Sequence, residues 1–483
     1  MNGNHFFPRK SAVIAIVICI AAFLQTSCTQ DGFDDGERFT TVTGVQLLSP
    51  IADSIMVTPD ATGSHQTISW PVVYGAGGYI VSLYNVNDPA NPVVVDSMEN
   101  VLVDATSIKV ARQEDTFYKF VISSAENTVA NNQAAKDASV KAYDTYVPTY
   151  RTIPSGTNLS TYFAAFAWPT DSQDVDLNFD LEAGGSYTMS DLVDFQLNKV
   201  TLRCTNKKNH PKVKFTGTNA GFAISAGFGL KNVDFNCSGS NIAFIGARAT
   251  PLITNVVNGN YYLEDKVNIQ SCKIDSVNSY FVYDNLTKTY IENVIVNNCV
   301  VNLTPSKTWD GVFYLNKGGN ILNLAVSNST FYRTGAFDYK YFYQTSGRAK
   351  NIGYASNTTG YTNCTFYNVC KDGQWGNYNG MAGQSNSYWT LTNDIFYNCS
   401  SSGVARRFLA GKQNQSTATF LNNTYAQNDG TIFDTPTGYD NTGTDIKEDP
   451  GFKDPANADF TISSTSKQAS LGTGDPRWLP AAQ

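Results

Sequence analysis

A six-residue phrase, apolar–any–Asn–any–any–apolar, occurs seven times between residues 230 and 425. Copies of such a unit, spaced here by 27 to 39 residues, are typical of a solenoid, in which each unit buries its apolar face only against its neighbours. The units are rich in Val, Ile, Thr, Phe and Tyr and lack helical spacing, which predicts strands and turns. We therefore expect an all-β chain that contains a right-handed, single-stranded parallel β-helix. The third position of the phrase is Asn232, Ser271, Asn298, Asn328, Asn363, Asn393 and Asn422.

The repeated Asn has a structural explanation. A tight turn between two parallel strands needs a residue that tolerates unusual φ and ψ and whose side chain can bond the local backbone. In successive coils the Asn amides can also bond one another. We expect a structural ladder, without a catalytic role, formed by Asn298, Asn328, Asn363, Asn393 and Asn422.

Three of the nine cysteines, Cys272, Cys299 and Cys364, directly follow the third position of the phrase. Matched positions on successive coils predict a stack of buried thiols, because Cys behaves as a small apolar residue in a protein interior. The sequence has no C-x-x-C pair and no His partner at zinc-ligand spacing. We therefore expect no metal site among these residues.

Residues 1–27 have the features of a targeting segment. Two basic residues precede an apolar run of signal-peptide length, which ends in Leu-Gln-Thr-Ser-Cys28. This resembles a bacterial lipoprotein signal, although Gln25 stands where an aliphatic residue is usual. The resemblance implies lipidation of Cys28, which would anchor the protein to a membrane without a spanning helix. An ordinary secretory signal or an uncleaved anchor is the alternative.

Residues 28–39 are short, acidic and contain Gly. This stretch resembles the acidic segment that directs Bacteroidetes lipoproteins to the outer face of the outer membrane. The resemblance implies a lipid-anchored outer-membrane protein that faces the cell exterior. A solvated linker without a targeting role is the alternative.

Residues 40–147 contain short alternating strands separated by turns, which is typical of a β-sandwich. Trp70 on an early strand, the G-A-G-G-Y step to Tyr79 and Tyr118 on a late strand resemble a fibronectin type III module. The resemblance implies that Trp70 and Tyr79 are core residues and that the module is a spacer. A carbohydrate-binding module is the alternative.

Residues 148–483 are expected to form the β-helix, with a capping helix over 158–167 that begins at Asn158. Near residue 450 the sequence contains D-P-x-F-x-D-P, then D-F-x-I and G-x-G, as in the closing segment of pectate-lyase-like β-helix proteins. The whole chain therefore looks like a Bacteroidetes surface lipoprotein of an uncharacterised pectate-lyase-like type. Such proteins commonly belong to polysaccharide-utilisation systems, which implies a polysaccharide ligand, pectin-like or another plant or host glycan, and other surface proteins of a glycan-uptake system as partners.

The net charge and the motifs disfavour several classes of ligand and reaction. The net charge of -7 argues against a nucleic-acid partner, which would need a basic face. Hydrolysis of a polygalacturonate-type bond needs paired carboxylates, and His65 and His210 lie outside the G-H-G motif of polygalacturonases. β-Elimination needs a base and a cation, but the R-x-P-x-x-R signature of one lyase family is absent. We expect no cofactor, or Ca²⁺ if the protein is a lyase.

Glycan binding without turnover is therefore the first interpretation, a polysaccharide lyase the second, a glycoside hydrolase less favoured, and a structural or adhesive surface protein a further alternative. Binding needs exposed aromatic rings, with amides and charges beside them. The loop around Trp375 is polar and Gly-rich, so we expect that ring to be exposed and to contact the ligand. Packing of Trp375 over the base of the loop is the alternative. Further candidate binding residues are Tyr378, Tyr339, Tyr341, Lys340, Arg348 and Trp309. No catalytic residue can be assigned.

Overall fold

The computed structural model describes residues 42–60, 65–170, 175–378, 385–401, 403–409, 416–427 and 440–480. The signal, Cys28 and the acidic tether lie outside the described residues. The chain divides into two compact units, and the boundary falls between Tyr146 and Val147, one residue before the expected position. Each unit has its own apolar core.

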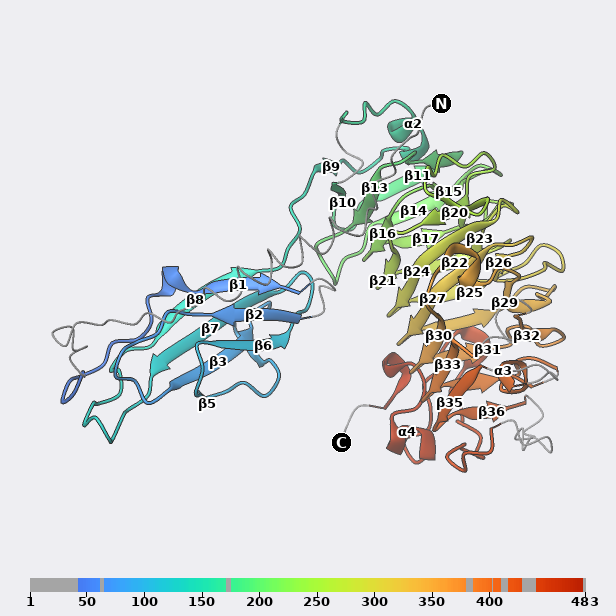
Figure 1. The fold of residues 1–483 in the computed structure, drawn as a ribbon. Helices are drawn as coiled ribbons and strands as arrows, with labels where there is room; N and C mark the ends of the chain where they lie inside the picture. The colour runs from blue at the N-terminus through green and yellow to red at the C-terminus, as the bar shows by residue number, and fades with distance from the viewer. Residues whose placement is uncertain are drawn as a thin grey trace, which may run out of the picture. The chain divides into compact units, whose positions relative to one another are not determined.

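The N-terminal unit is a β-sandwich of two antiparallel sheets, as the sequence predicts (Figure 1). A short 3-10 helix, η1 (Ala52–Ser54), precedes the strands. One sheet has the order β1 (Met56–Pro59), β2 (His65–Ser69), β6 (Ser107–Ala111). The other has the order β4 (Val93–Val94), β3 (Tyr79–Asn85), β7 (Phe117–Ser124), β8 (Ser139–Asp144), and β5 (Val101–Val103) also pairs with β3. Trp70 and Tyr79 are buried with their rings edge to face at 5.5 Å, which confirms them as core residues.

The C-terminal unit consists of three parallel sheets that each coil visits in the order A, B, C (Figure 1). Sheet A contains β9 (Arg151–Ile153), β10 (Asp176–Leu181), β13 (Lys199–Arg203), β16 (Phe228–Lys231), β21 (Val267–Gln270), β24 (Thr289–Asn297), β27 (Asn320–Ser327), β30 (Asn357–Thr362), β33 (Ser387–Thr392) and β35 (Thr417–Leu421). Sheet B contains β11 (Ser186–Met189), β14 (Lys212–Phe215), β17 (Asp234–Asn236), β22 (Lys273–Val277), β25 (Val300–Leu303), β28 (Thr330–Arg333), β31 (Thr365–Tyr367), β34 (Ile395–Tyr397) and β36 (Thr424–Ala426). Sheet C contains β12 (Leu192–Asp194), β15 (Gly221–Ile224), β18 (Ile245–Ala247), β23 (Val282–Tyr283), β26 (Phe313–Leu315), β29 (Tyr341–Thr345) and β32 (Gln374–Asn377). Parallel pairing of successive coils in all three sheets is the arrangement of a parallel β-helix.

The remaining elements are short. A hairpin of β19 (Val256–Val257) and β20 (Asn260–Leu263) extends sheet A beside β24. The helices are α2 (Leu159–Ala164), η2 (Ala349–Ile352), α3 (Arg406–Leu409), η3 (Pro455–Asn457), α4 (Lys467–Leu471) and η4 (Pro476–Trp478). Helix α2 begins after Asn158, whose side chain accepts hydrogen bonds from the backbone N–H groups of Ser160 and Thr161. This confirms Asn158 as the N-cap residue of a helix at the first coils.

The repeated Asn residues lie at the turn between sheets A and B. All seven third positions have φ between +48° and +55°, the left-handed region that Asn tolerates better than other residues with a side chain. Asn422 Nδ2 donates to Asn393 Oδ1, Asn393 to Asn363, and Asn363 to Asn328, at 3.1 to 3.2 Å. The ladder changes register below this point, because Asn328 donates to Asn297 instead of Asn298. The predicted Asn ladder is therefore confirmed for Asn328, Asn363, Asn393 and Asn422, whereas Asn298 donates to the Ser271 hydroxyl instead of joining it.

The predicted stack of thiols is also confirmed. Cys272, Cys299 and Cys364 are buried and free. They occupy one inward row beside the Asn turn, and Asp394 lies in the same row one coil after Cys364. Its Oδ1 accepts the backbone N–H of Cys364 at 2.8 Å, and burial raises its pKa well above the usual range. This row therefore mixes thiols with hydrogen-bonded polar groups.

Residues 449–478 pack against the outer face of sheet B. The ring of Phe460 lies 5.3 Å from those of Tyr332 and Tyr367 on neighbouring coils. Asp475 Oδ2 accepts a hydrogen bond from the Thr330 hydroxyl at 2.7 Å. Arg477 Nη2 donates to Oδ1 of Asn298, at the turn between sheets A and B, at 2.7 Å. We call residues 449–478 the C-terminal strap, since they bind across several coils.

Candidate functional site

The strongest sequence candidate, Trp375, is not a surface residue. It lies on strand β32 instead of a loop, and its side chain is completely buried. The ring stacks on Phe342 of the preceding coil at 4.4 Å and meets Phe366 edge to face at 4.9 Å. The prediction that Trp375 contacts a ligand is therefore wrong. The polar neighbours that suggested a loop include Gln374, which is half-buried on the outer side of the same strand.

Two further candidates are also wrong because their rings belong to the core. Tyr378 is 3% exposed and lies 4.4 Å from the ring of Trp389. A Cβ on Gly376 would collide with the Tyr378 ring, so the glycine beside it makes room for this packing. Tyr339 is 1% exposed, and its hydroxyl donates to the carbonyl of Ser279 at 2.6 Å.

Arg348 is exposed but stands apart from the other candidates. It precedes the 3-10 helix η2, and its backbone N–H donates to the Tyr290 hydroxyl at 3.0 Å. It lines neither of the two hollows described below. The structure therefore separates Arg348 from Trp309, Lys340 and Tyr341, which line a hollow. The buried Tyr339 also borders one of these hollows.

The outer face of sheet C contains two adjacent hollows. The first, which we call the aromatic hollow, has a volume of about 400 Å³. It is lined by residues of the coils that carry β12, β15, β18 and β23, together with Trp309. The lining includes Gly246, Arg248, Tyr280 and Tyr283. The second, the polar hollow, has a volume of about 420 Å³ and includes Arg333, Asp338, Lys340, Tyr341 and Asp372. Thr308 lines the polar hollow and its neighbour Trp309 the aromatic one, so this segment forms their common border.

Strand register explains why aromatic rings reach the outer face. Gly246, Tyr283 and Tyr314 are paired in register on successive strands of sheet C. The residues just before them, Ile245, Val282 and Phe313, are fully buried, and side chains alternate between the two faces of a strand. Because Gly246 has no side chain, the row contains a gap next to Tyr283. That gap forms part of the aromatic hollow.

The rings of the aromatic hollow form one cluster. Tyr280 lies parallel to Tyr283 at 4.4 Å and to Tyr314 at 5.1 Å, and Trp309 meets Tyr280 at 4.9 Å. Tyr283 and Trp309 remain half-buried, so parts of their rings face the solvent. Trp309 is held by a hydrogen bond from its Nε1 to the carbonyl of Asn278 at 2.7 Å. Aromatic faces fixed in this way can receive the apolar face of a flat ligand.

Polar groups border these rings. Arg248 lines the aromatic hollow, and its Nη1 lies 3.2 Å from Oδ2 of Asp194 on β12. Burial is the main cause that raises the pKa of Tyr283 to about 12, and the neighbouring Asp284 adds to it. The Tyr283 hydroxyl is therefore neutral at physiological pH and can both donate and accept hydrogen bonds.

The charged groups of the polar hollow are engaged in the fold. Oδ1 of Asp338 accepts the backbone N–H groups of Tyr339 and Cys370, and Oδ2 accepts that of Asp372. Arg333 lies 3.2 Å from the same carboxylate. These contacts give Asp338 a structural role, although burial raises its pKa.

Lys340 is exposed and bonds Asp310 Oδ1 at 2.8 Å. The hydrogen bond and the charge of Asp310 raise the pKa of Lys340. A general base must be able to lose its proton near the working pH, so this contact makes Lys340 a poor base for β-elimination. The described residues contain no group of three or more His, Cys, Asp or Glu that could hold a metal ion.

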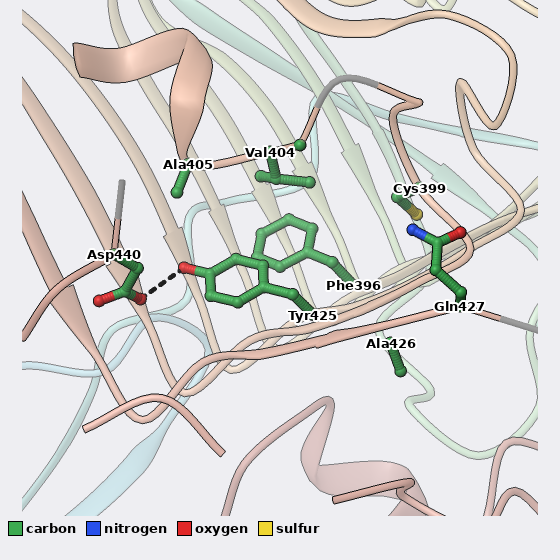
Figure 2. Close-up of a pocket in the computed structure, with 9 residues that line it drawn as sticks. Phe396, Cys399, Val404, Ala405, Tyr425, Ala426, Gln427 and Asp440 are labelled. Atoms are coloured by element: carbon green, nitrogen blue, oxygen red, sulfur yellow. Dashed lines mark hydrogen bonds between the residues drawn. The ribbon is translucent and has the colours of Figure 1, made fainter. Parts of the chain in front are cut away.

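A third hollow is lined by Phe396 of β34, Tyr425 of β36 and residues of the segments that follow these strands (Figure 2). Its volume is about 10 Å³, which is enough for one water molecule and not for a sugar ring. The hydroxyl of Tyr425 donates to Asp440 at 2.7 Å, and both side chains are buried. This contact therefore belongs to the packing of the last coils.

No described helix is long and apolar enough to cross a bilayer.

Sequence reasoning missed Tyr280, Tyr283 and Arg248. The signal is present in N-S-Y-F-V-Y at 278–283, where two aromatic residues flank an apolar pair. In the sheet C segments of β18, β23, β26 and β29 two successive residues point inward, such as Phe281 and Val282. The residues on either side of that pair therefore point outward. The spacing can be read from the sequence only after the position of sheet C is known.

Three domain families match parts of the sequence, and each is described only as a domain of unknown function. DUF4992 matches residues 1–184, DUF4957 matches 185–334, and DUF5123 matches 360–478. No curated protein matches the chain. Among solved structures, pectate lyase PelI from Erwinia chrysanthemi in complex with tetragalacturonic acid is similar over 80% of this chain and 92% of that chain, with 11% identity and a TM-score of 0.15. The fold assignment rests on the strand pairing, since this likeness is too weak to carry an argument.

Proposed function

We propose that this protein is a cell-surface lipoprotein that binds polysaccharide on the outer face of sheet C. The observation that carries the proposal is the cluster of Tyr280, Tyr283, Tyr314 and Trp309 beside the aromatic hollow. Fixed aromatic faces next to a few convergent polar groups are the usual composition of a sugar-binding surface. The hollow of about 400 Å³ is large enough for one or two sugar rings of a longer chain.

The proposed cellular setting follows from the N-terminal sequence. Lipidation at Cys28 would hold the protein at the outer membrane, and the acidic tether would direct it to the cell exterior. The sandwich would then act as a spacer of fibronectin type III type. Tyr118 supports this module, because its hydroxyl accepts the backbone N–H of Gln113 at 2.8 Å, as in the tyrosine corner of such sandwiches. Other proteins of a polysaccharide-utilisation system are the proposed partners.

The test fills the hollow without disturbing the fold. A Cβ on Gly246 would have no neighbour closer than 3.8 Å, so Gly246→Ile adds a side chain to the hollow without a backbone clash. Gly360→Ile is the matched control, because Gly360 lies on β30 of sheet A with equally open space around it. The full chain in detergent is run through affinity gels that contain pectins, plant glycans or host glycans.

We expect at least one polysaccharide to retard the wild-type protein and the Gly360→Ile variant. Gly246→Ile should lose that retardation by about tenfold or more in affinity. Equal retardation of both variants would contradict the assignment of the aromatic hollow. Appearance of unsaturated products during incubation with pectin would instead show that the protein is a lyase.

A further inference from the structure

The cations that border the two hollows are already matched with carboxylates. Arg248 lies 3.2 Å from Asp194, and Lys340 lies 2.8 Å from Asp310. In the polar hollow Arg333 lies 3.2 Å from Asp338, while Asp372 lines the same hollow as a further carboxylate. An anionic ligand would therefore have to compete with carboxylates that are part of the protein.

A carboxylate, Asp310, also acts on the rings of the aromatic hollow. After burial, the charge of Asp310 is the largest cause that raises the pKa of Tyr280. A carboxylate that raises the pKa of a neighbouring phenol disfavours further negative charge at that position. An anionic sugar stacked on these rings would meet the same repulsion.

Lys307 differs from the other cations because it lies against an aromatic ring instead of a carboxylate. Its ammonium group lies over the Trp309 ring, 4.1 Å from the centroid, in a cation–π contact. This ammonium group is exposed, and an exposed charge attracts an anion only weakly in water. The described residues also lack a carboxylate cluster that could hold a metal ion to bridge acidic sugars.

We propose that the outer face of sheet C binds a neutral glycan, with sugar rings on the aromatic cluster and hydroxyl groups on the Arg248–Asp194 pair. A sugar hydroxyl donates to one carboxylate oxygen and accepts from a guanidinium N–H, so it can join this pair without breaking it. A uronate would displace Asp194 from Arg248 and leave an unpaired carboxylate next to the ligand, which costs binding energy. This inference rests on the proposed function and names its ligand class.

The experiment compares two forms of the same polysaccharide chain. Fully methyl-esterified and fully de-esterified polygalacturonate have the same sugar ring and differ in charge. The full chain in detergent is titrated with each form, and with galactan, xylan, glucan and mannan, at low and high salt. We expect binding to at least one of the neutral chains, at least about tenfold weaker binding to the de-esterified chain, and little effect of salt on the neutral ligands.

Asp194→Asn provides a second readout, since it removes the carboxylate that holds Arg248. We expect it to raise affinity for de-esterified polygalacturonate and to make that affinity salt-dependent. Asp180→Asn is the control, because it removes the carboxylate from another Asp–Arg pair, with Arg203 on sheet A, away from both hollows. If the wild type binds de-esterified polygalacturonate as tightly as any neutral chain, the inference of a neutral glycan is wrong, whereas the proposed polysaccharide binding still holds. Failure of every glycan to bind would overturn the proposed function itself.

Discussion

Asp284 gives a sharp test of the electrostatics beneath the proposed site. It directly follows Tyr283 on the sheet C side of the coil, and its side chain is fully buried. Oδ1 accepts the backbone N–H of Leu286 at 2.9 Å, but Oδ2 has no hydrogen-bond partner. Burial raises the pKa of this carboxyl from 3.8 to about 7. The folded protein therefore favours the neutral acid.

The cost in stability follows from the pKa values of Asp284 in the unfolded and folded states. A shift of one pKa unit corresponds to 1.36 kcal/mol, so a rise from 3.8 to about 7 lowers stability by about 4 kcal/mol once both states are ionised. Because the folded pKa is the higher one, this cost is absent below about pH 4. It grows as pH rises toward 7 and stays constant above. The Asp284→Asn variant, which cannot ionise, escapes it.

The assay is thermal unfolding of the full chain and of Asp284→Asn between pH 4 and pH 8. We expect the melting temperature of the variant, relative to wild type, to rise with pH by roughly 5 °C and to level off above pH 7. Asp459→Asn is the control. Hydrogen bonds from Thr461 and Lys453 lower the pKa of Asp459 to about 2, so the change in melting temperature caused by Asp459→Asn should be constant above pH 5. A difference for Asp284→Asn that does not change between pH 4 and pH 8 would refute the reasoning.

Two further predictions concern the β-helix itself. Trp375→Ala should cost about 3–5 kcal/mol of stability in thermal or urea unfolding because it empties a fully buried ring site, whereas Gln374→Ala on the outer side should cost little. Comparable losses from the two variants would contradict the burial of Trp375. Asn363→Ala should destabilise the protein by about 2–3 kcal/mol, since it combines a left-handed backbone with the loss of its two ladder hydrogen bonds. Asn363→Gly loses the same hydrogen bonds without backbone strain and should cost less, and an equal cost would exclude strain as a cause.

The fold was predictable because each coil needs the same residue type at the same turn, which produces a repeat in the sequence. Asn at a left-handed turn is needed in every coil, so Asn328, Asn363, Asn393 and Asn422 recur in register with the structure. The buried thiols follow from the same phase, since a residue next to a fixed turn has a fixed direction. The capping role of Asn158 follows from local backbone chemistry and needs no tertiary information.

The site was less predictable because it depends on contacts between coils. Trp375 has polar and Gly neighbours, and composition alone suggests exposure. Its burial depends on Phe342 and Phe366, which come from earlier segments of the chain. Conversely, the exposed part of Tyr283 depends on Gly246, a residue 37 positions earlier whose missing side chain leaves the gap. Among the candidates, Trp309, Lys340 and Tyr341 lie at a hollow on the outer side of the solenoid, and Arg348 is exposed away from both hollows.

The C-terminal strap has a consequence for how the chain is made. A ribosome produces the coils in order, and each coil can settle on the one before it. Arg477 and Asp475, however, bind residues synthesised 179 and 145 positions earlier. Until the strap emerges, sheet B exposes Tyr332 and Tyr367 to the solvent. A chain that stops before the strap begins at residue 449 therefore keeps a row of uncovered aromatic rings, by which a protease or chaperone can distinguish it from a finished one.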